Sequence, residues 1–206
     1  DALIVGEISH SYLYSADACK RIAELGPDTK LMVCLREPVD RAFSAYLDGV
    51  KNGKYSGTFE EELERSREIL ERGMYAKYLT PWVERFGRQR LHAGVFDELG
   101  EDPERFAGRV FEFLGLSPIP LTPRELGRMM PAALPRLKPV MKLAKKGSRL
   151  LEQLGFRRLR GRFKTSRYIR HLLYRPYTEQ NRPVMQPATR QALQELFRPE
   201  ILRLDE

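Results

Sequence analysis

Apolar positions along the chain fall either into short continuous runs or into helical spacing. Residues 31–35 (LMVCL) form a run without a polar residue, which is typical of a strand covered on both faces inside a parallel sheet. Residues 91–96 form a second predicted strand, and residues 2–5 a third. Helical spacing and capping residues predict helices at 17–25, from Pro38 onward, at 58–72, 74–86, 102–115 and 187–204. This alternation predicts an α/β fold with a parallel sheet flanked by helices.

Several residues mark where these helices begin and end. Thr58 and Glu61 have the spacing of a capping box, and Asp102 precedes a proline at the first helical position. Gly87 and Gly115 follow two of the helices and can adopt the left-handed conformation that ends a helix.

Two helices carry an apolar stripe that predicts core packing. Tyr75 and Trp82 lie seven residues apart and therefore share one helix face. Leu193, Leu196 and Phe197 are expected to form the apolar stripe of the last helix.

The length of 206 residues is that of one domain, and the composition excludes several classes of protein. No apolar run approaches the ~20 residues of a membrane span, and no signal peptide is visible. The two cysteines predict free thiols and a cytoplasmic, reducing location, with Cys34 buried in its strand. Three histidines without metal-ligand spacing predict no metal site. Because the chain opens directly on an apolar run, we expect an N-terminally incomplete domain.

The charge of the chain is concentrated in one segment, residues 136–182, which we call the basic lobe. This lobe has 15 Lys plus Arg and two acids, so its net charge is +13 and the rest of the chain carries −5. We expect two or three short helices here, after an extended, proline-rich crossing at 117–139. The lobe could be a solvated face, a surface for an anionic acceptor or membrane, or a nucleic-acid surface. We favour the acceptor or membrane surface, because no nucleic-acid-reading motif accompanies the charge.

The most informative candidate site begins where the strand at 31–35 ends. Arg36 follows this strand directly, and Pro38 is suited to the first helical position. Ligands bind at the carboxyl ends of strands in open α/β sheets, and free N–H groups at a helix start attract anions. This arrangement predicts an anion site. Ser44, about two turns into the helix, joins it only if the ligand lies along the helix.

Residues 35–46 (LREPVDRAFSAY) closely resemble the 3′-phosphate-binding segment of sulfotransferases that use PAPS, 3′-phosphoadenosine 5′-phosphosulfate. The usual form of this segment is L-R-N-P-V-D-R-A-Y-S-x-Y, so Glu37 replaces the commoner Asn. In the family, the Arg and Ser at these positions bind the 3′-phosphate. The resemblance implies this role for Arg36 and Ser44, and a sheet like that of P-loop kinases.

Other segments resemble heparan-sulfate-type and related bacterial members of this family. They are residues 6–15 (GEISHSYLYS) and 73–86 (GMYAKYLTPWVERF). Ile8 stands where heparan-type members have a Lys that contacts the acceptor, which argues against a heparan-like acceptor. Tyr75 could edge the nucleotide or acceptor pocket. Arg182 lies where heparan-type members have a K-G-R loop that grips the 3′-phosphate.

The resemblance implies transfer of a sulfuryl group from PAPS to a hydroxyl or amine, with PAP as the product and no metal. The expected acceptor is a carbohydrate or a lipid-linked molecule. The family's Lys-containing loop for the 5′-phosphosulfate is not visible in this sequence, so we expect it to precede the chain. His10 and Glu7 are the candidate catalytic residues. Two alternatives stay open: a non-catalytic protein that binds nucleotide or an anionic polymer, and a nucleotide-dependent kinase.

Overall fold

The computed structural model describes residues 5–126, 133–135, 174–178 and 181–205. The chain divides into two compact units. Unit 1 contains residues 1–42, 67–127 and 187–206, and unit 2 contains residues 43–66 and 128–186. The boundary between Ala42 and Phe43 falls within one continuous helix, α2 (Pro38–Lys51). The predicted single domain stays a prediction, and each unit is described by itself below.

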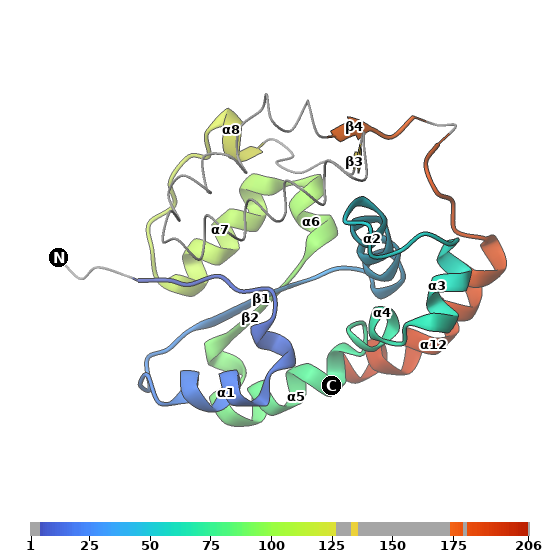
Figure 1. Cartoon of the computed structure of the whole chain (residues 1–206). Helices are drawn as coiled ribbons and strands as arrows, with labels where there is room; N and C mark the ends of the chain where they lie inside the picture. The colour runs from blue at the N-terminus through green and yellow to red at the C-terminus, as the bar shows by residue number, and fades with distance from the viewer. Residues whose placement is uncertain (1–4, 127–132, 136–173, 179–180, 206) are drawn as a thin grey trace, which may run out of the picture. The chain divides into compact units, whose positions relative to one another are not determined.

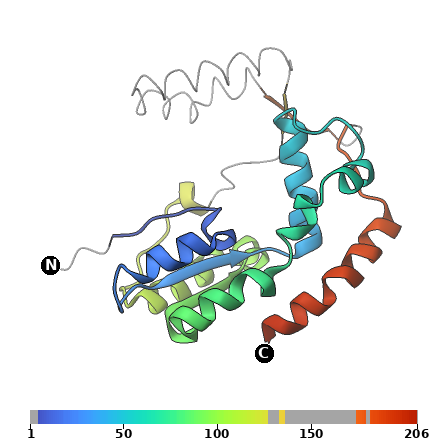
Figure 2. The ribbon, with the colours of Figure 1, turned by 60° about the horizontal axis from the view of Figure 1, so that its bottom comes forward.

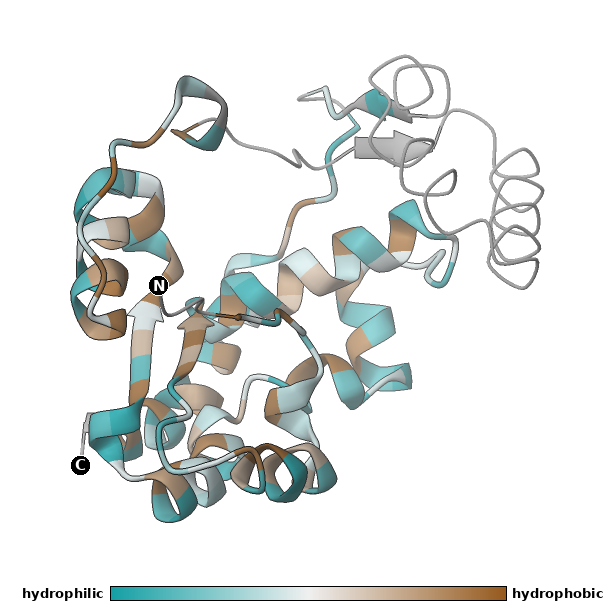
Figure 3. Cartoon of the chain, turned by 90° about the vertical axis from the view of Figure 1, so that its left-hand side faces the viewer, coloured by the Kyte–Doolittle hydropathy of each residue, from teal (hydrophilic) through white to brown (hydrophobic). Residues whose placement is uncertain are grey.

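Unit 1 is built on a two-stranded parallel sheet, β1 (Leu31–Leu35) and β2 (Leu91–Val95), which pair from Leu31 opposite Leu91 to Leu35 opposite Val95. The strands carry apolar residues along much of their length (Figure 3). Parallel strands need a crossover, which here includes α5 (Tyr75–Phe86). The sequence therefore predicted both strands and the α/β class correctly.

Helices cover both faces of this sheet (Figure 1). On one face, Cys19 of α1 (Ala16–Ala23) and Trp82 of α5 form a cluster that also packs against Leu31 and Leu91. On the other face, α7 (Pro103–Leu114) places Phe106 so close to Gly94 that a β-carbon there would lie 2.6 Å from the ring. A glycine in β2 thus permits the close packing of helix on sheet.

The expectation that β1 is buried on both faces was wrong. Met32 is 45% exposed and Cys34 is also exposed, because on their side of the sheet the described helices pack over β2. The second cysteine, Cys19, is buried. Both thiols are free.

The long C-terminal helix α12 (Pro187–Asp205) packs against α5 in unit 1 (Figure 2). Leu193 and Phe197 of α12 are buried, as predicted, but Leu196 is 43% exposed because it lies off the buried face. Glu200 accepts a hydrogen bond from the backbone N–H of Lys77 at 3.2 Å. The Glu200 carboxylate therefore satisfies one of the free N–H groups at the start of α5, which has no side-chain cap of its own.

An aromatic cluster lies in unit 2, between the second part of α2 and α3 (Phe59–Arg65). The rings of Phe43 and Phe59 meet edge to face with centroids 5.2 Å apart, and those of Tyr46 and Tyr55 stack at 6.1 Å. A short antiparallel pair, β3 (Ala133–Pro135) and β4 (Tyr174–Pro176), also belongs to this unit.

Most predicted helix boundaries agree with the structure. The Thr58–Glu61 capping box and the Asp102 cap are both formed, and Gly115 adopts the left-handed conformation. Gly87 has a positive φ of 77° but a ψ of 155°, so it ends α5 outside the left-handed helical region. The remaining described elements are η1 (Tyr12–Tyr14), α4 (Glu68–Glu71), η2 (Arg88–Arg90), α6 (Phe96–Glu101) and α8 (Pro123–Leu126).

Three predictions differ from the structure or lie outside it. The helix expected at 58–72 is divided into α3 and α4, because Ser66 is extended, with φ −135° and ψ 95°. The crossing at 117–139 contains the short helix α8 and the strand β3. Of the expected strand at 2–5 only Val5 is described, and it is not in a strand. Most of the basic lobe, apart from β4 and its neighbours, lies outside the described residues. Within the described ranges, no helix is long and apolar enough to cross a membrane.

Candidate functional site

The candidate anion site begins at the carboxyl end of β1, in unit 1. Arg36 is half-buried there, and its guanidinium carbon lies 5.3 Å from the ring centroid of Phe96. Phe96 is the first residue after β2, so the neighbouring strand delivers it to the same edge of the sheet. The Arg36 Nε is buried and has no hydrogen-bond partner among the described residues. The Nε atoms of Arg41 and Arg109 are in the same state, so this feature shows that the Arg36 guanidinium is not committed to a hydrogen bond at that atom.

The backbone of Arg36 is held by Tyr75, the first residue of α5. The Tyr75 hydroxyl donates to the carbonyl oxygen of Arg36 at 2.9 Å. Tyr75 is only 4% exposed, and burial raises the pKa of its hydroxyl to about 12. The hydroxyl consequently stays protonated at physiological pH and remains a donor. Core packing of Tyr75, and of Trp82 seven residues later, was predicted correctly.

Glu37 changes the chemistry expected at the start of α2. Its carboxylate accepts hydrogen bonds from the backbone N–H groups of Val39 at 3.1 Å and Asp40 at 2.7 Å. The expectation that the helix start offers free N–H groups to an anion was therefore wrong for these two. A glutamate is long enough to fold back onto the first turn and act as its cap. An anion at this edge must rely on side chains, of which Arg36 is the nearest in sequence.

Two side chains in the first turn of α2, Asp40 and Arg41, attach this turn to other elements of unit 1. The Arg41 guanidinium donates to the carbonyl oxygen of Ile69, and an ion pair joins Asp40 to Arg190 of α12 at 2.7 Å. Burial lowers the pKa of Arg41 from its ordinary value. The first turn of α2 is thus attached both to α4, which contains Ile69, and to the C-terminal helix α12.

The remaining predicted site residues lie in other parts of the chain. Ser44 is half-buried on α2 and Arg182 is exposed, and both belong to unit 2, whereas Arg36 and Tyr75 belong to unit 1. Arg182 lies close enough to Tyr177 for its charge to oppose the rise that burial causes in the pKa of that hydroxyl.

The two candidate catalytic residues occupy the segment before η1. Glu7 is exposed and accepts a hydrogen bond from the Tyr12 hydroxyl at 2.6 Å, which raises the pKa of Tyr12. His10 is exposed in the turn that precedes η1. Ile8, between them, is fully exposed.

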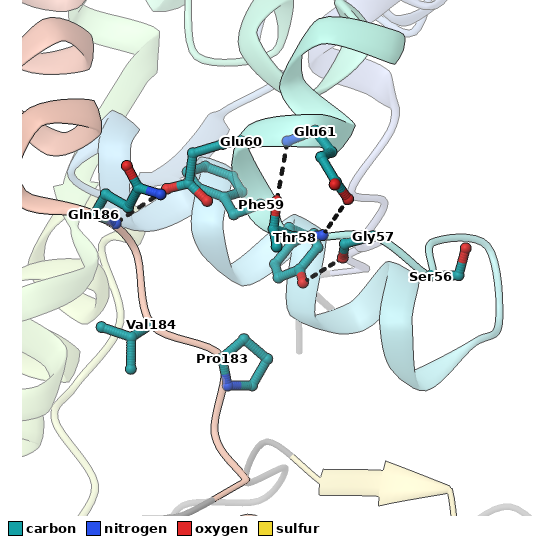
Figure 4. Close-up of a pocket in the computed structure, with 10 residues that line it drawn as sticks. Ser56, Gly57, Thr58, Phe59, Glu60, Glu61, Pro183, Val184 and Gln186 are labelled. Carbon is teal, nitrogen blue, oxygen red and sulfur yellow. Dashed lines mark hydrogen bonds between the residues drawn. The ribbon is translucent and has the colours of Figure 1, made fainter.

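Unit 2 contains a cavity of about 460 Å³ between the start of α3 and the segment before α12 (Figure 4). Glu60 accepts a hydrogen bond from the backbone N–H of Gln186 at 3.0 Å, and the Tyr46 hydroxyl donates to the carbonyl oxygen of Gly57 at 2.9 Å. None of the described residues that line this cavity is Lys or Arg. The described part of its lining therefore offers no cationic group for a nucleotide phosphate.

Sequence reasoning missed two participants at the Arg36 site, Phe96 and the Glu37 cap. Phe96 could have been inferred, because parallel strands end at the same edge of a sheet and residue 96 is the last residue of the second predicted strand. Among the residues that the structure describes, no group of three or more His, Cys, Asp or Glu side chains is arranged to hold a metal ion.

Comparison with known proteins identifies relatives over most of the chain. A family model described as "Sulfotransferase domain" matches residues 20–201. Human heparan sulfate glucosamine 3-O-sulfotransferase 3B1 is 33% identical over 128 residues, which are 58% of this chain and 33% of that protein. Rat carbohydrate sulfotransferase 15 is 24% identical over 119 residues, covering 45% of this chain and 21% of that protein. The chain thus spans about a third of the length of its heparan sulfate relatives.

A solved structure shares the fold. The sulfotransferase from Alicyclobacillus acidocaldarius superposes with a TM-score of 0.61 and 22% identity, over 96% of this chain and 61% of that chain. At this level of identity the likeness concerns the fold alone, and it confirms the α/β class predicted from the sequence.

Proposed function

The chain belongs to the sulfotransferase family, and from this premise we propose that it transfers a sulfuryl group from PAPS to a hydroxyl or amine of a carbohydrate acceptor. For a hydroxyl, a bond forms between the acceptor oxygen and sulfur while the bond between sulfur and the 5′-phosphate oxygen breaks. PAP leaves with that electron pair, and a base takes the proton of the acceptor. Such a reaction depends on in-line positioning and on stabilisation of the leaving charge. The carbohydrate class follows the names of the relatives.

The observation that carries the proposal is the position of Arg36, which directly follows the carboxyl end of β1. Its Nε is buried without a partner among the described residues, in the segment that resembles the family's 3′-phosphate site. A guanidinium offers a planar fork of donors that matches a phosphate and keeps its charge at all physiological pH values. Arg36 is therefore proposed as the main contact of the 3′-phosphate, with Ser44 and Arg182 as further contacts.

The base is proposed to come from Glu7 or His10. A carboxylate or an imidazole can accept the acceptor's proton, and a histidine titrates near neutral pH. The hydrogen bond from Tyr12 fixes one oxygen of Glu7 and leaves the other available. Glu7→Gln and His10→Ala should each be assayed for the rate of transfer with nucleotide affinity as a control, because loss of a base reduces the rate and leaves nucleotide affinity unchanged.

Nucleotide binding can be tested by thermal unfolding with PAP, ATP or buffer alone. A ligand at about a hundredfold excess over its Kd stabilises the folded state by about 2.7 kcal/mol. We expect PAP to stabilise the protein, ATP to do so less, and Arg36→Ala to abolish the difference. Arg21→Ala is the matched control, because Arg21 is an exposed cation on α1. Absence of a PAP shift, or a shift that Arg36→Ala leaves unchanged, would refute the proposed nucleotide site, and a preference for ATP would favour a kinase.

The acceptor can be tested by transfer of labelled sulfate from PAPS to glycans of different classes and to lipid-linked saccharides. Transfer to a carbohydrate supports the proposal. Binding of PAP without transfer to any of these acceptors would instead support a non-catalytic binding protein.

A further inference from the structure

Two aromatic side chains contact different parts of Arg36. Tyr75 binds its backbone, since the hydroxyl donates to the Arg36 carbonyl oxygen at 2.9 Å. Phe96 contacts its side chain, since the guanidinium carbon lies 5.3 Å from the ring centroid, within the range of a cation–π interaction. Backbone and side chain of Arg36 are therefore each attached to a separate element, α5 and the start of α6.

Tyr75 has a defined position because residues of α12 contact the start of its helix, α5. The backbone N–H of Lys77, two residues later, is bound by Glu200 of α12. Gly73, two residues earlier, lies directly against the fully buried ring of Phe197. These contacts from the C-terminal helix hold the first turn of α5, and through it the Tyr75 hydroxyl.

The ring of Phe96 contacts the guanidinium of Arg36. The Arg36 Nε has no hydrogen-bond partner in the described part of the chain, and the guanidinium carbon lies 5.3 Å from the centroid of the Phe96 ring. Phe96 is 43% exposed, which leaves one part of its ring open to solvent. An aromatic face stabilises a guanidinium without occupying its donors, so these donors stay available for an anion.

We propose that Tyr75 and Phe96 are positioning residues, which together hold Arg36 in the orientation that binds the 3′-phosphate. This inference rests on the proposed function. Neither residue needs to touch the nucleotide: Tyr75 acts through the backbone of Arg36, and Phe96 through its guanidinium. An arginine side chain that is already oriented loses less conformational freedom when it binds, and affinity increases accordingly.

The test is calorimetric titration of PAP into the purified protein and its variants. Tyr75→Phe removes the hydrogen bond and keeps the ring, so we expect the Kd for PAP to rise about fivefold. Phe96→Leu removes the aromatic face and should raise the Kd for PAP about threefold. Phe96→Tyr keeps the aromatic face, and its Kd should equal that of the wild type. The controls are Tyr78→Phe on the same helix and Phe113→Leu, whose ring lies under Lys30 rather than Arg36. Both should bind PAP as the wild type does.

A positioning role also predicts dependence on Arg36. In an Arg36→Ala background, Tyr75→Phe and Phe96→Leu should change the Kd by less than about twofold, because the side chain that they orient is gone. An undiminished loss in this background, or full affinity in both single variants, would overturn the inference while leaving the proposed function intact. If Tyr75→Phe does not fold, the contrast between Phe96→Leu and Phe96→Tyr decides. Failure of the wild type to bind PAP would overturn the proposed function itself.

Discussion

Replacing Gly73 by alanine should destabilise unit 1 through a collision that the structure defines. A β-carbon at this position would lie 2.7 Å and 2.8 Å from two ring carbons of Phe197 and 3.2 Å from the carbonyl oxygen of Leu70. Apolar carbons prefer separations of about 3.5–4.0 Å, so the ring would have to move by most of an ångström. Phe197 has no exposed surface, and its surroundings leave it little room to move.

The magnitude follows from two opposing effects. Inserting a methyl group into a packed interior costs about 1–3 kcal/mol. Alanine also lowers the conformational entropy of the unfolded chain, and this raises the free energy of unfolding by about 0.4–1 kcal/mol where the backbone tolerates the new residue. Gly73 is not among the glycines with positive φ, so its backbone does tolerate alanine. We therefore expect Gly73→Ala to lower the free energy of unfolding by about 1–2 kcal/mol.

Urea unfolding followed by tryptophan fluorescence measures this change directly. Trp82 is the only tryptophan of the chain and is buried in unit 1, where Gly73 and Phe197 also lie. Gly108→Ala is the control, because a β-carbon at Gly108 meets nothing within 4 Å and alanine in a helix should stabilise by about 0.5–1 kcal/mol.

A double-mutant cycle separates the collision from other causes. Phe197→Leu shortens the side chain, so Gly73→Ala should cost less in this background than in the wild type, by more than about 0.5 kcal/mol. Equal costs in both backgrounds would refute the reasoning, because the Phe197 ring would then not be what opposes the methyl group.

Three further predictions concern carboxylates. Glu37→Gln removes a negative charge beside Arg36 and should tighten PAP binding about threefold in calorimetric titration; unchanged or weaker binding would contradict it. Glu200→Gln weakens the anionic cap on the Lys77 N–H and should cost about 0.5–1 kcal/mol in urea unfolding, whereas no change would mean that the cap is dispensable. Glu62 is buried, and hydrogen bonds from the N–H groups of Gly57 and Ser56 lower its pKa below 4.5. Because the folded pKa is depressed, the stabilisation exists above 4.5 and is lost as the pH falls through the folded value. Glu62→Gln should therefore destabilise the protein near neutral pH but not in strong acid, and an equal effect at both pH values would contradict this.

Local signals in the sequence predicted the elements well, whereas burial depended on contacts that no local pattern contains. The Thr58–Glu61 capping box and the Asp102 cap formed as expected, since each involves residues three apart. Met32 and Cys34 are exposed because burial of a strand depends on which distant helices cover it. Likewise, apolar spacing placed Leu196 on the stripe of α12, but the width of the contact with α5 left it outside.

The candidate site shows the same division. Arg36 at the end of a strand was visible in the sequence, because the run at 31–35 and Pro38 fix its place. The Glu37 cap depends on how far a side chain folds back onto the following turn, which residue type alone does not decide. The contacts of Arg36 with Tyr75 and Phe96 join residues 39 and 60 positions apart in the chain, so they required the fold.

The unequal exposure of the two cysteines gives the molecule a built-in attachment point for a reporter. Cys19 is 3% exposed, whereas Cys34 is open to solvent two residues before Arg36, so a thiol-reactive fluorophore would label one position without any substitution. Although Cys34 is exposed, its sulfur is partly covered, and this desolvation together with the nearby carboxylates of Asp97 and Glu98 raises the pKa of the Cys34 thiol. Labelling therefore requires mildly alkaline buffer. A dye there would signal events at the end of β1 from a distance of two peptide units.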